Sequence, residues 1–330
     1  MIVTRTPYRV SLIGGGTDYP AWYETHGGAV LATTINRYCY VSARYLPPFY
    51  DHHSRIVYSR TELVVSNDAI EHPAVRGVLQ YLGITRGVEI HHHGDLPGRS
   101  GIGSSSAFVV GLLHALQALE SQPPDKLALA RQAIAVEHDV LHESVGCQDQ
   151  VLAALGGLLR IEFPRAGAPL PSPMLISAER REELRSRLLL FFTGTTRTAS
   201  DVARDQLARL PEMSAAMHRL GDLVNHAQHL LESDTPMDEL GAVLHDAWLI
   251  KRGLSASVTT PTIDALYERA RRAGALGGKI LGAGGGGFLL VFAAPDKHED
   301  IRAALSELLE VTVGFDSSGS QIMVQDESYR

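Results

Sequence analysis

The sequence predicts an α+β protein built from two domains. Strand-like and helix-like segments are mixed within each half of the chain, which favours two mixed units over one doubly wound sheet. A chain of 330 residues is long enough to bury two medium-sized cores. The segment FPRAGAPLPSPM, residues 163–174, is rich in proline, glycine and alanine and has no apolar periodicity. We therefore expect one domain over residues 1–175 and a second over residues 176–330.

The first half begins with β-branched and aromatic segments that are typical of strands. Gly83 provides a helix stop signal, and Asp125 provides an N-cap for a later, longer helix within residues 123–143. A glycine-containing loop, SVGCQDQ, leads into VLAALGG. The other expected helices are 72–83 and 107–120, and the expected strands are 8–13, 29–35, 38–46, 87–93 and 158–163.

The second half mixes helices with strands in the same way. A glycine stretch at 282–286 separates two of the expected strands. The expected strands are 187–194, 278–281, 287–294, 311–315 and 320–325, and the expected helices are 210–232, 237–254, 262–274 and 298–310.

The composition restricts the class of partner. The formal net charge is -7, which argues against nucleic acid as the main partner because binding to a phosphate backbone needs a basic face. The net charge does not exclude a local site for a small anion. Cys39 and Cys147 are too few for a disulfide framework, and their spacing does not suggest structural zinc. The N-terminal segment lacks a secretion-signal pattern and no apolar run has membrane-spanning length, so we expect a cytoplasmic protein without a membrane partner.

Residues 98–107, GRSGIGSSSA, form a small-residue loop between an expected strand and an expected helix. Gly98, Gly101 and Gly103 supply backbone freedom, and the serines at 104–106 open the helix, where N–H groups have no internal partner. Unpaired donors at the positive end of a helix dipole form an anion site, most often for phosphate. A flexible loop with a serine cap is the alternative interpretation.

Two familiar phosphate loops do not match this segment. Ser104 stands where a Walker A loop has its lysine, which normally reaches the outer phosphates. The run GIGSSS imitates a dinucleotide fingerprint, but the residues about twenty positions on, SQPPDKL, form a turn rather than a strand that ends in an acidic residue.

Three segments in order, RTPYRVSLIGGGTDYP, PGRSGIGSSSA and KILGAGGGG, resemble the three motifs of the GHMP kinases and span nearly the whole chain. The resemblance implies a ribosomal-protein-like α/β nucleotide domain followed by a ferredoxin-like C-terminal domain. It implies ATP and Mg²⁺ as cofactors, a substrate between the domains, and contact between the late glycine stretch and the phosphate loop. The residues expected to bind ATP are Pro97, Gly98, Gly101, Ile102, Gly103, Ser104, Ser105, Ser106, Ala107, Gly284 and Gly285.

The resemblance also assigns residues to phosphoryl transfer. Glu137 matches the magnesium-binding glutamate of the family, with Ser105 as the hydroxyl ligand and its two serine neighbours as alternatives. Asp149 matches the catalytic aspartate, which would accept the proton of the sugar hydroxyl or orient that hydroxyl. Arg9 would stabilise charge on the transferred group or lower the pKa of Asp149. An exposed glutamate, an N-cap aspartate and a strand-edge arginine are the corresponding ordinary roles.

The first motif carries the expected acceptor site. Asp18 matches the sugar-binding aspartate of the family, and Gly15, Gly16 and Thr17 precede it. Galactokinases have Glu-His in place of Gly15-Gly16, which argues against galactose. The segments GGGTDYP, FFTGTTRTASDV and 255–288 look closest to sugar 1-kinases that act on D-glycero-D-manno-heptose 7-phosphate. This resemblance implies transfer of the γ-phosphoryl group of ATP to the C1 hydroxyl, a step in making nucleotide-activated heptose for surface glycans.

A substrate 7-phosphate would need cations far from the ATP site. Arg197, Lys251 and Arg252 are the candidates, with solvated helix charge as the alternative. The three histidines at 91–93 alternate between the two faces of a strand, so we expect them to be structural rather than metal ligands. Cys147 is expected to be a packed thiol.

Two other functions fit the same motifs. One is a different sugar 1-kinase, similar to fucokinase or galactokinase. The other is a non-catalytic sensor that binds ATP and sugar on this fold, although retention of Arg9, Glu137, Asp149 and the serines favours catalysis. We expect a small-molecule sugar phosphate as the partner, and a homodimer is a compatible assembly.

Overall fold

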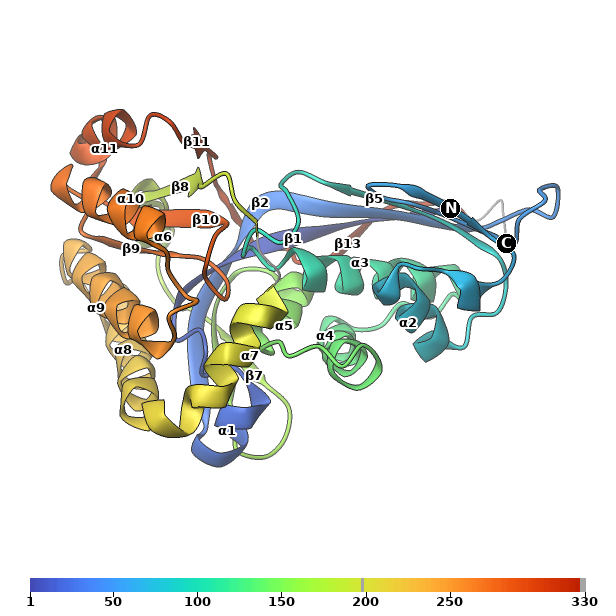
Figure 1. Cartoon of the computed structure of the whole chain (residues 1–330), viewed down its shortest axis with the longest axis horizontal. Coiled ribbons are helices and arrows are strands. Elements are labelled where there is room, and N and C mark those ends of the chain that lie inside the picture. Colours follow the sequence, from blue (N-terminus) through green and yellow to red (C-terminus); the bar gives the residue numbers. More distant parts are fainter. Residues whose placement is uncertain (197–198, 327–330) are drawn as a thin grey trace.

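The computed structural model of the chain describes residues 1–196 and 199–326 and contains two β-sheets with helices packed around them (Figure 1). Within these residues, the larger sheet has nine strands and the smaller sheet has four. The predicted α+β class is therefore confirmed. None of the helices in this part of the chain combines the length and the apolar character needed to cross a bilayer.

The larger sheet follows the order β13-β1-β2-β5-β3-β4, and β6, β7 and β12 join it through β2 and β6. The β3–β5 pair is parallel, and the other pairs are antiparallel. Its strands are β1 (Ile2–Ile13), β2 (Gly28–Tyr45), β3 (Ser54–Val57), β4 (Thr61–Val64), β5 (Val88–Gly94), β6 (Leu158–Phe163), β7 (Leu170–Pro173), β12 (Phe315–Asp316) and β13 (Gln321–Gln325).

Strand β2 is a single element of 18 residues, where the sequence predicted two strands. Its first part pairs with β6, its last part pairs with β5, and β1 runs along the other side. Asn36, between the predicted strands, stays extended because Gly314 satisfies its backbone and side chain. The Asn36 N–H donates to the Gly314 carbonyl at 2.9 Å, and the Asn36 amide oxygen accepts from the Gly314 N–H at 2.7 Å. Because Gly314 is so distant in sequence, no local pattern around Asn36 predicts that the strand continues through it.

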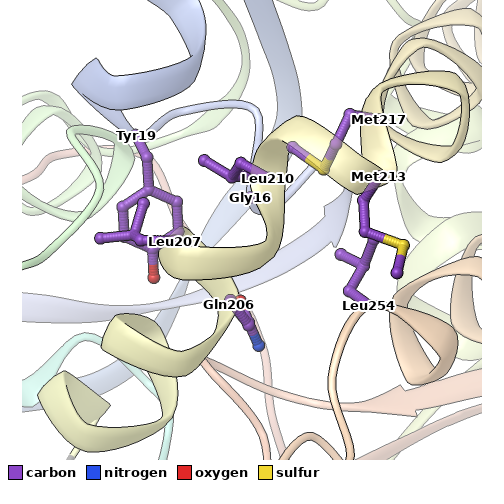
Figure 2. Close-up of a pocket in the computed structure, with 8 residues that line it drawn as sticks. All are labelled: Gly16, Tyr19, Gln206, Leu207, Leu210, Met213, Met217 and Leu254. Carbon is purple, nitrogen blue, oxygen red and sulfur yellow. The ribbon is translucent and has the colours of Figure 1, made fainter.

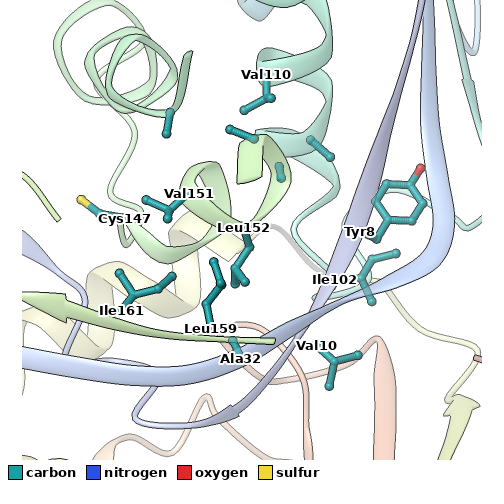
Figure 3. Close-up of a cluster of buried hydrophobic side chains, with 14 of the residues drawn as sticks. Tyr8, Val10, Ala32, Ile102, Val110, Cys147, Val151, Leu152, Leu159 and Ile161 are labelled. Carbon is teal, nitrogen blue, oxygen red and sulfur yellow. The ribbon is translucent and has the colours of Figure 1, made fainter. Parts of the chain in front are cut away.

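Helices α2 to α5 lie along one face of the larger sheet (Figure 1) and share a hydrophobic core with it (Figure 3). Gly83 ends α2 in the left-handed conformation, and the Asp125 carboxylate accepts from the Ala128 N–H at 2.8 Å, both as predicted. The long helix predicted within 123–143 instead becomes α4 followed by a π-helical turn, Val136–Val140. The helices of this half are α1 (Pro20–His26), α2 (Pro73–Leu82), α3 (Ser104–Leu119), α4 (Lys126–Ala135) and α5 (Gln148–Leu155), with a 3-10 turn at Asn67–Ala69.

The smaller sheet is antiparallel and has the order β11-β8-β10-β9. A second core beneath it includes Trp248, Tyr267 and Leu289. Its strands are β8 (Leu188–Phe192), β9 (Gly277–Ile280), β10 (Phe288–Phe292) and β11 (Leu309–Glu310). The helices of this half are α6 (Ala178–Ser186), α7 (Ala199–Arg209), α8 (Ser214–Glu232), α9 (Asp238–Leu254), α10 (Pro261–Arg272) and α11 (His298–Ala304), with 3-10 turns at Leu210–Met213 and Pro295–Lys297.

The last strands return to the larger sheet. Strand β12 pairs with β2, and β13 pairs with β1. The N-terminal ammonium donates to the Asp326 carbonyl at 2.7 Å, so residues 1 and 326 lie side by side. The predicted linker at 163–174 contains β7, which pairs with β6. The division into residues 1–175 and 176–330 remains a prediction. In the structure, residues 315–325 of the second part pair with strands of the first part.

Candidate active site

The loop of residues 95–103 joins β5 to α3 and contains the residues at which we expect an anion to bind. Gly103 is the N-cap of α3 with a φ of 73°, and no side chain caps the helix there. Ile102 is completely buried, and its carbonyl accepts from the Arg9 N–H at 3.1 Å, which fixes the loop to β1. The first N–H groups of α3 have no intrahelical partner, and small residues leave them accessible. This geometry suits a phosphate group.

The loop of residues 281–287, between β9 and β10, lies directly on the phosphate loop. A Cβ on Gly282 would lie 2.5 Å from Gly101 Cα, and a Cβ on Gly287 would lie 2.2 Å from the Ser100 carbonyl oxygen. The Phe288 N–H also donates to this carbonyl at 3.2 Å. Only glycine permits such backbone contact, as the resemblance implied.

Gly284 and Gly285, which we expect to contact ATP, lie against the segment after α9. A Cβ on Gly284 would lie 2.5 Å from the Val258 carbonyl oxygen, and the Gly285 N–H donates to that carbonyl at 2.8 Å. The structure thus assigns contact with the phosphate loop to Gly282 and Gly287, while Gly284 and Gly285 anchor their loop to the segment after α9.

Arg9 and Asp149 form a two-pronged ion pair beside the phosphate loop. Arg9 Nε donates to Asp149 Oδ1 and Arg9 Nη2 donates to Oδ2, each at 2.7 Å. Arg9 Nη1 also donates to the Gly101 carbonyl. Asp149 is the second residue of α5 rather than its N-cap, which is Cys147. The carboxylate is therefore fixed by an arginine, and it lies next to Gly103, whose Cβ would be 3.2 Å from Asp149 Oδ2.

Asp18 lies in the turn after β1 and is only 2% exposed. Its carboxylate accepts from the Gly16 N–H and from Gln148 Nε2, each at 2.8 Å. Burial raises its pKa, and these hydrogen bonds oppose the rise, while the charge of Asp149 adds to it. Thr17 has a different role from the expected one, because its Oγ1 lies 2.8 Å from the carbonyl oxygens of Gly14 and Ala29 and so fixes the turn.

Glu137 lies in the π-helical turn and is completely buried. Its Oε2 accepts from Ser106 Oγ at 3.0 Å and from Gln150 Nε2. The pKa of Glu137 is raised to about 8, mainly by burial and also by the charges of Glu143 and Asp149, against the effect of the two hydrogen bonds. The serine in contact with Glu137 is Ser106 and not the expected Ser105, because Ser105 is exposed on the first turn of α3.

The donor set at Glu137 fits a magnesium ion. Among the described residues, Glu137 Oε1 is buried without a hydrogen-bond partner. A carboxylate oxygen next to serine hydroxyls is the hard oxygen donor set that Mg²⁺ prefers, and Mg²⁺ fills its remaining positions with water and phosphate oxygens.

Two buried lysines complete the charge cluster. Lys251 Nζ donates to the Gly282 carbonyl, and Lys279 Nζ donates to the Leu12 carbonyl at 3.2 Å. Burial lowers the pKa of Lys251 to about 8, with Asp18 and Asp149 opposing the shift and Arg9 adding to it. Burial and the charge of Lys251 lower the pKa of Lys279.

Lys251 and Arg252, two of the cations expected to bind a substrate 7-phosphate, contact different parts of the structure. Lys251 was expected far from the ATP site, but it contacts the glycine loop that covers the phosphate loop. Arg252 points to α10, where it pairs with Asp264 at 3.3 Å. Arg197 lies outside the described residues. Adjacent positions on a helix face directions about 100° apart, which explains why Lys251 and Arg252 separate.

A small apolar pocket lies beside the acceptor motif (Figure 2). Figure 2 shows α7 and the following turn on one side of it and Tyr19 on another. Gln206 Nε2 donates to the Ala283 carbonyl at 2.9 Å and so ties α7 to the glycine loop. The lining residues are Gly16, Tyr19, Gln206, Leu207, Leu210, Met213, Met217 and Leu254.

The histidine run and Cys147 make packing and polar contacts. His91 pairs with Glu89 at 2.9 Å, while His92 packs against Phe108. Across the described residues, no group of three ligating side chains converges as a metal site. Cys147 is buried, and burial raises the pKa of its thiol to about 12.

Sequence reasoning missed several members of this site. Gln148, Gln150 and Lys279 bind or surround the predicted acids, and Ser106 was only an alternative to Ser105. The two glutamines next to Asp149 were a usable signal, because the neighbours of an acid at the start of a helix face adjoining parts of the site. Lys279 gave no signal beyond being a lysine in an otherwise apolar strand.

Comparisons with known proteins agree with this geometry. Two family profiles match, "GHMP kinases N terminal domain" over residues 68–157 and "GHMP kinases C terminal" over residues 210–311. A D-glycero-alpha-D-manno-heptose 7-phosphate kinase of Campylobacter jejuni is 29% identical over 316 residues, which cover 92% of this chain and 93% of that protein. A bifunctional fucokinase/GDP-fucose pyrophosphorylase of Arabidopsis thaliana is 27% identical over 93% of this chain and 31% of its own length.

The fold also matches a solved structure. The crystal structure of a D-glycero-D-manno-heptose 1-phosphate kinase from Bacteroides thetaiotaomicron superposes with a TM-score of 0.81 at 23% identity, over 99% of this chain and 100% of that one. The first family profile contains the phosphate loop, Glu137 and Asp149, and the second contains Lys251 and the late glycine loop. The profiles thus include the phosphate loop and the late glycine loop, which meet in the site, and the chain belongs to the GHMP kinase family.

Proposed function

We propose that this GHMP kinase transfers the γ-phosphoryl group of ATP to the C1 hydroxyl of D-glycero-D-manno-heptose 7-phosphate. The product is the 1,7-bisphosphate, and the step supplies nucleotide-activated heptose for surface glycans. Membership of the family makes the chain a phosphotransferase with an alcohol acceptor. The Campylobacter jejuni relative supports the choice of sugar, because it carries the name of this substrate and aligns with 92% of the chain.

The observation that carries the proposal is the position of the Arg9–Asp149 pair at the edge of the phosphate loop. Arg9 bonds both carboxylate oxygens and the Gly101 carbonyl, so the acid and the phosphate loop share one rigid support. Phosphoryl transfer needs a nucleophile oriented next to positioned phosphates, with little further chemistry from the protein. This arrangement meets that need.

The residues of the chain divide the work as follows. Asp149 accepts the proton of the attacking sugar hydroxyl, and Arg9 holds its two oxygens in a fixed orientation. Asp18 orients a second sugar hydroxyl, because Gly16 and Gln148 fix its carboxylate. The N–H groups of residues 101–106 bind the phosphate oxygens, and the apposed glycine loop excludes water from them.

Magnesium would be held by Glu137 together with a serine hydroxyl at the start of α3. When bound, the ion neutralises charge on the phosphates. Ser106 is supported by its contact with the carboxylate, and Ser105 by the family match. Because the pKa of Glu137 is raised to about 8, this carboxyl group must release a proton before it can bind the metal.

A fucokinase-like sugar 1-kinase is the second candidate. The pocket beside Gly16 is lined mainly by leucine and methionine side chains, which suit the methyl group of a 6-deoxy sugar better than a phosphate. The fucokinase relative aligns with 93% of this chain.

A coupled ADP-release assay tests both candidates. Purified protein with ATP and Mg²⁺ is offered free and phosphorylated hexoses, 6-deoxyhexoses and heptoses, and carbon NMR of the product locates the new phosphate. We expect the highest kcat/KM with the heptose 7-phosphate and a phosphate on C1. Preference for fucose would support the second candidate, and ATP binding without turnover of any sugar would support the sensor.

A further inference from the structure

Polar groups from three separate elements converge on Gly15. Ser11 belongs to β1, Gln148 to α5 and Lys251 to α9. The position that a Cβ on Gly15 would occupy lies 3.2 Å from Ser11 Oγ, 3.6 Å from Gln148 Nε2 and 4.0 Å from Lys251 Nζ. Residues separated by more than 100 positions thus surround one small space next to Asp18.

The groups around this space are buried and incompletely bonded. Ser11, Gln148 and Lys251 are 4%, 6% and 7% exposed. Among the described residues, Ser11 Oγ and Gln148 Oε1 have no hydrogen-bond partner. The Lys251 ammonium has three protons that it can donate. Within residues 1–196 and 199–326, it donates one of them to the Gly282 carbonyl. Buried polar groups without partners cost stability, so their retention in one place points to a ligand.

The orientation of Gln148 follows from its neighbour. Asp18 accepts a hydrogen bond from Gln148 Nε2 at 2.8 Å, and an ionised carboxylate can only accept. With the Asp18 carboxylate ionised, the amide nitrogen faces Asp18 and the amide oxygen is left without a hydrogen-bond partner among the described residues. The space is thus bounded by an acceptor, by the donating ammonium of Lys251, and by a serine hydroxyl that can do either.

We propose that Ser11, Gln148 and Lys251 form a subsite for one hydroxyl group of the sugar acceptor, beside the hydroxyl held by Asp18. A sugar hydroxyl matches the set, because it donates to Gln148 Oε1 while it accepts from Lys251 Nζ. An ionised phosphate oxygen has no proton for the amide oxygen, and a methyl group leaves all three groups unsatisfied. Lys251 is thus a substrate-binding residue for a hydroxyl rather than for the 7-phosphate. This inference rests on the proposed function only in taking a sugar as the acceptor.

Singly deoxygenated analogues of the accepted sugar test the subsite. In the wild type we expect one analogue whose kcat/KM falls about 100-fold more than the others, because its absence leaves buried groups unpaired. In Lys251→Met the same analogue should lose much less relative to the full sugar, since one of the buried partners of the missing hydroxyl is gone. Arg252→Met is the matched control: this cation is next to Lys251 in α9 but pairs with Asp264 at 3.3 Å, so the penalty should stay as in the wild type.

Gly15→Ala gives an independent test that leaves every charge in place. Gly15 does not have a positive φ, so alanine adds no backbone strain, but its methyl group would stand 3.2 Å from Ser11 Oγ inside the subsite. We expect a higher KM for the sugar and an unchanged KM for ATP. Gly253→Ala is the control, because nothing lies within 4 Å of its Cβ position.

The outcomes separate this inference from the proposed function. Equal penalties for every analogue in the wild type and in Lys251→Met, or a Gly15→Ala variant with an unchanged KM for the sugar, would overturn the subsite. If the assay panel identifies a sugar other than the heptose, the proposed substrate is wrong and the analogue series of that sugar still tests the subsite. If no sugar is turned over, both fail.

Discussion

Arg9 and Asp149 meet through two hydrogen bonds of 2.7 Å, and this contact sets the expected behaviour of the acid. We predict that Asp149→Asn lowers kcat by a factor of about 10² to 10⁴, because an amide cannot accept the proton of the sugar hydroxyl. The KM for ATP should stay unchanged, since the phosphate loop keeps its shape. Steady-state kinetics with both substrates measure the effect.

Asp125→Asn is the control for this substitution. Asp125 caps α4, and asparagine caps helices equally well, so its activity should equal that of the wild type. If Asp149→Asn retains full turnover, Asp149 is not the proton acceptor. The kinase assignment would then rest on the phosphate loop and the family match alone.

Glu137 makes stability depend on pH. Its pKa is raised from 4.5 to about 8 by burial, so the folded state binds this proton more tightly than the unfolded state does. The resulting stabilisation is complete below about pH 4.5 and is lost as the pH rises through about 8. We predict that the free energy of unfolding of the wild type falls relative to that of Glu137→Gln between about pH 6 and pH 8, as measured by urea titration without metal.

Magnesium with an ATP analogue should reduce that fall in the wild type, because the ligands bind the ionised carboxylate. Glu137→Gln should lack this response. A constant difference in unfolding free energy between the two proteins across this pH range would show that the carboxyl group keeps an ordinary pKa in the folded protein.

At the scale of elements, two loops depend on glycine for different reasons. Gly282 and Gly83 have φ values of 69° and 66°, so alanine strains the backbone at both. Only Gly282 touches another segment, with its Cβ position 2.5 Å from Gly101 Cα, while nothing lies within 4 Å of the Gly83 position. We predict that both alanine variants lose stability but that only Gly282→Ala also loses ATP affinity, by at least about tenfold, because the phosphate loop is displaced. Calorimetric titration with ADP and thermal melts separate the two effects, and equal ADP affinities would contradict the assigned loop contact.

Elements with local signals were predictable from the sequence. Gly83 and Asp125 end and start helices through interactions within a few residues, so their patterns were sufficient. Helix α6 has a single buried residue, Leu184, and therefore lacks the apolar stripe from which a helix is recognised. Helix α3 starts at Ser104, as the serine run predicted, although its apolar run begins only at Ala107.

The residues of the site also include some that the sequence predicted and some that it did not. Arg9, Asp18, Glu137 and Asp149, which the resemblance assigned to one site, lie near one another in the structure. The neighbours that complete the site come from distant segments, and nothing in the spacing of Lys279 indicates that it will face Leu12. The choice between Ser105 and Ser106 depends on the rotation of α3 about its axis, which the packing of the helix on β1 and β2 decides.

At the scale of the whole molecule, the chain order does not follow the two sheets. Strand β13 covers one side of β1, and Met217 and Val224 of α8 belong to the same core as β1 and β2. A fragment ending at residue 175 would therefore leave one edge of β1 unpaired, because only β2 would still pair with it, and would leave the core partly exposed. We keep 175/176 as the proposed division between the nucleotide and substrate sides, but we expect the two sides to unfold together, because elements of the second half complete the core of the first.

The side chain of Ser320 offers a test of whether the two sides unfold together. Its Oγ lies 2.9 Å from Thr6 Oγ1 and 2.9 Å from His114 Nδ1, so it joins the C-terminal segment to β1 and α3. We predict that Ser320→Ala lowers the free energy of unfolding by about 1 to 3 kcal/mol, because two buried polar groups lose a partner. If the sides are one cooperative unit, calorimetry should show a single transition that moves as a whole, while Ser317→Ala, at an exposed position, should leave it in place. Two transitions, of which Ser320→Ala shifts only one, would show instead that the sheets unfold separately and that residues 315–325 fold with the first of them.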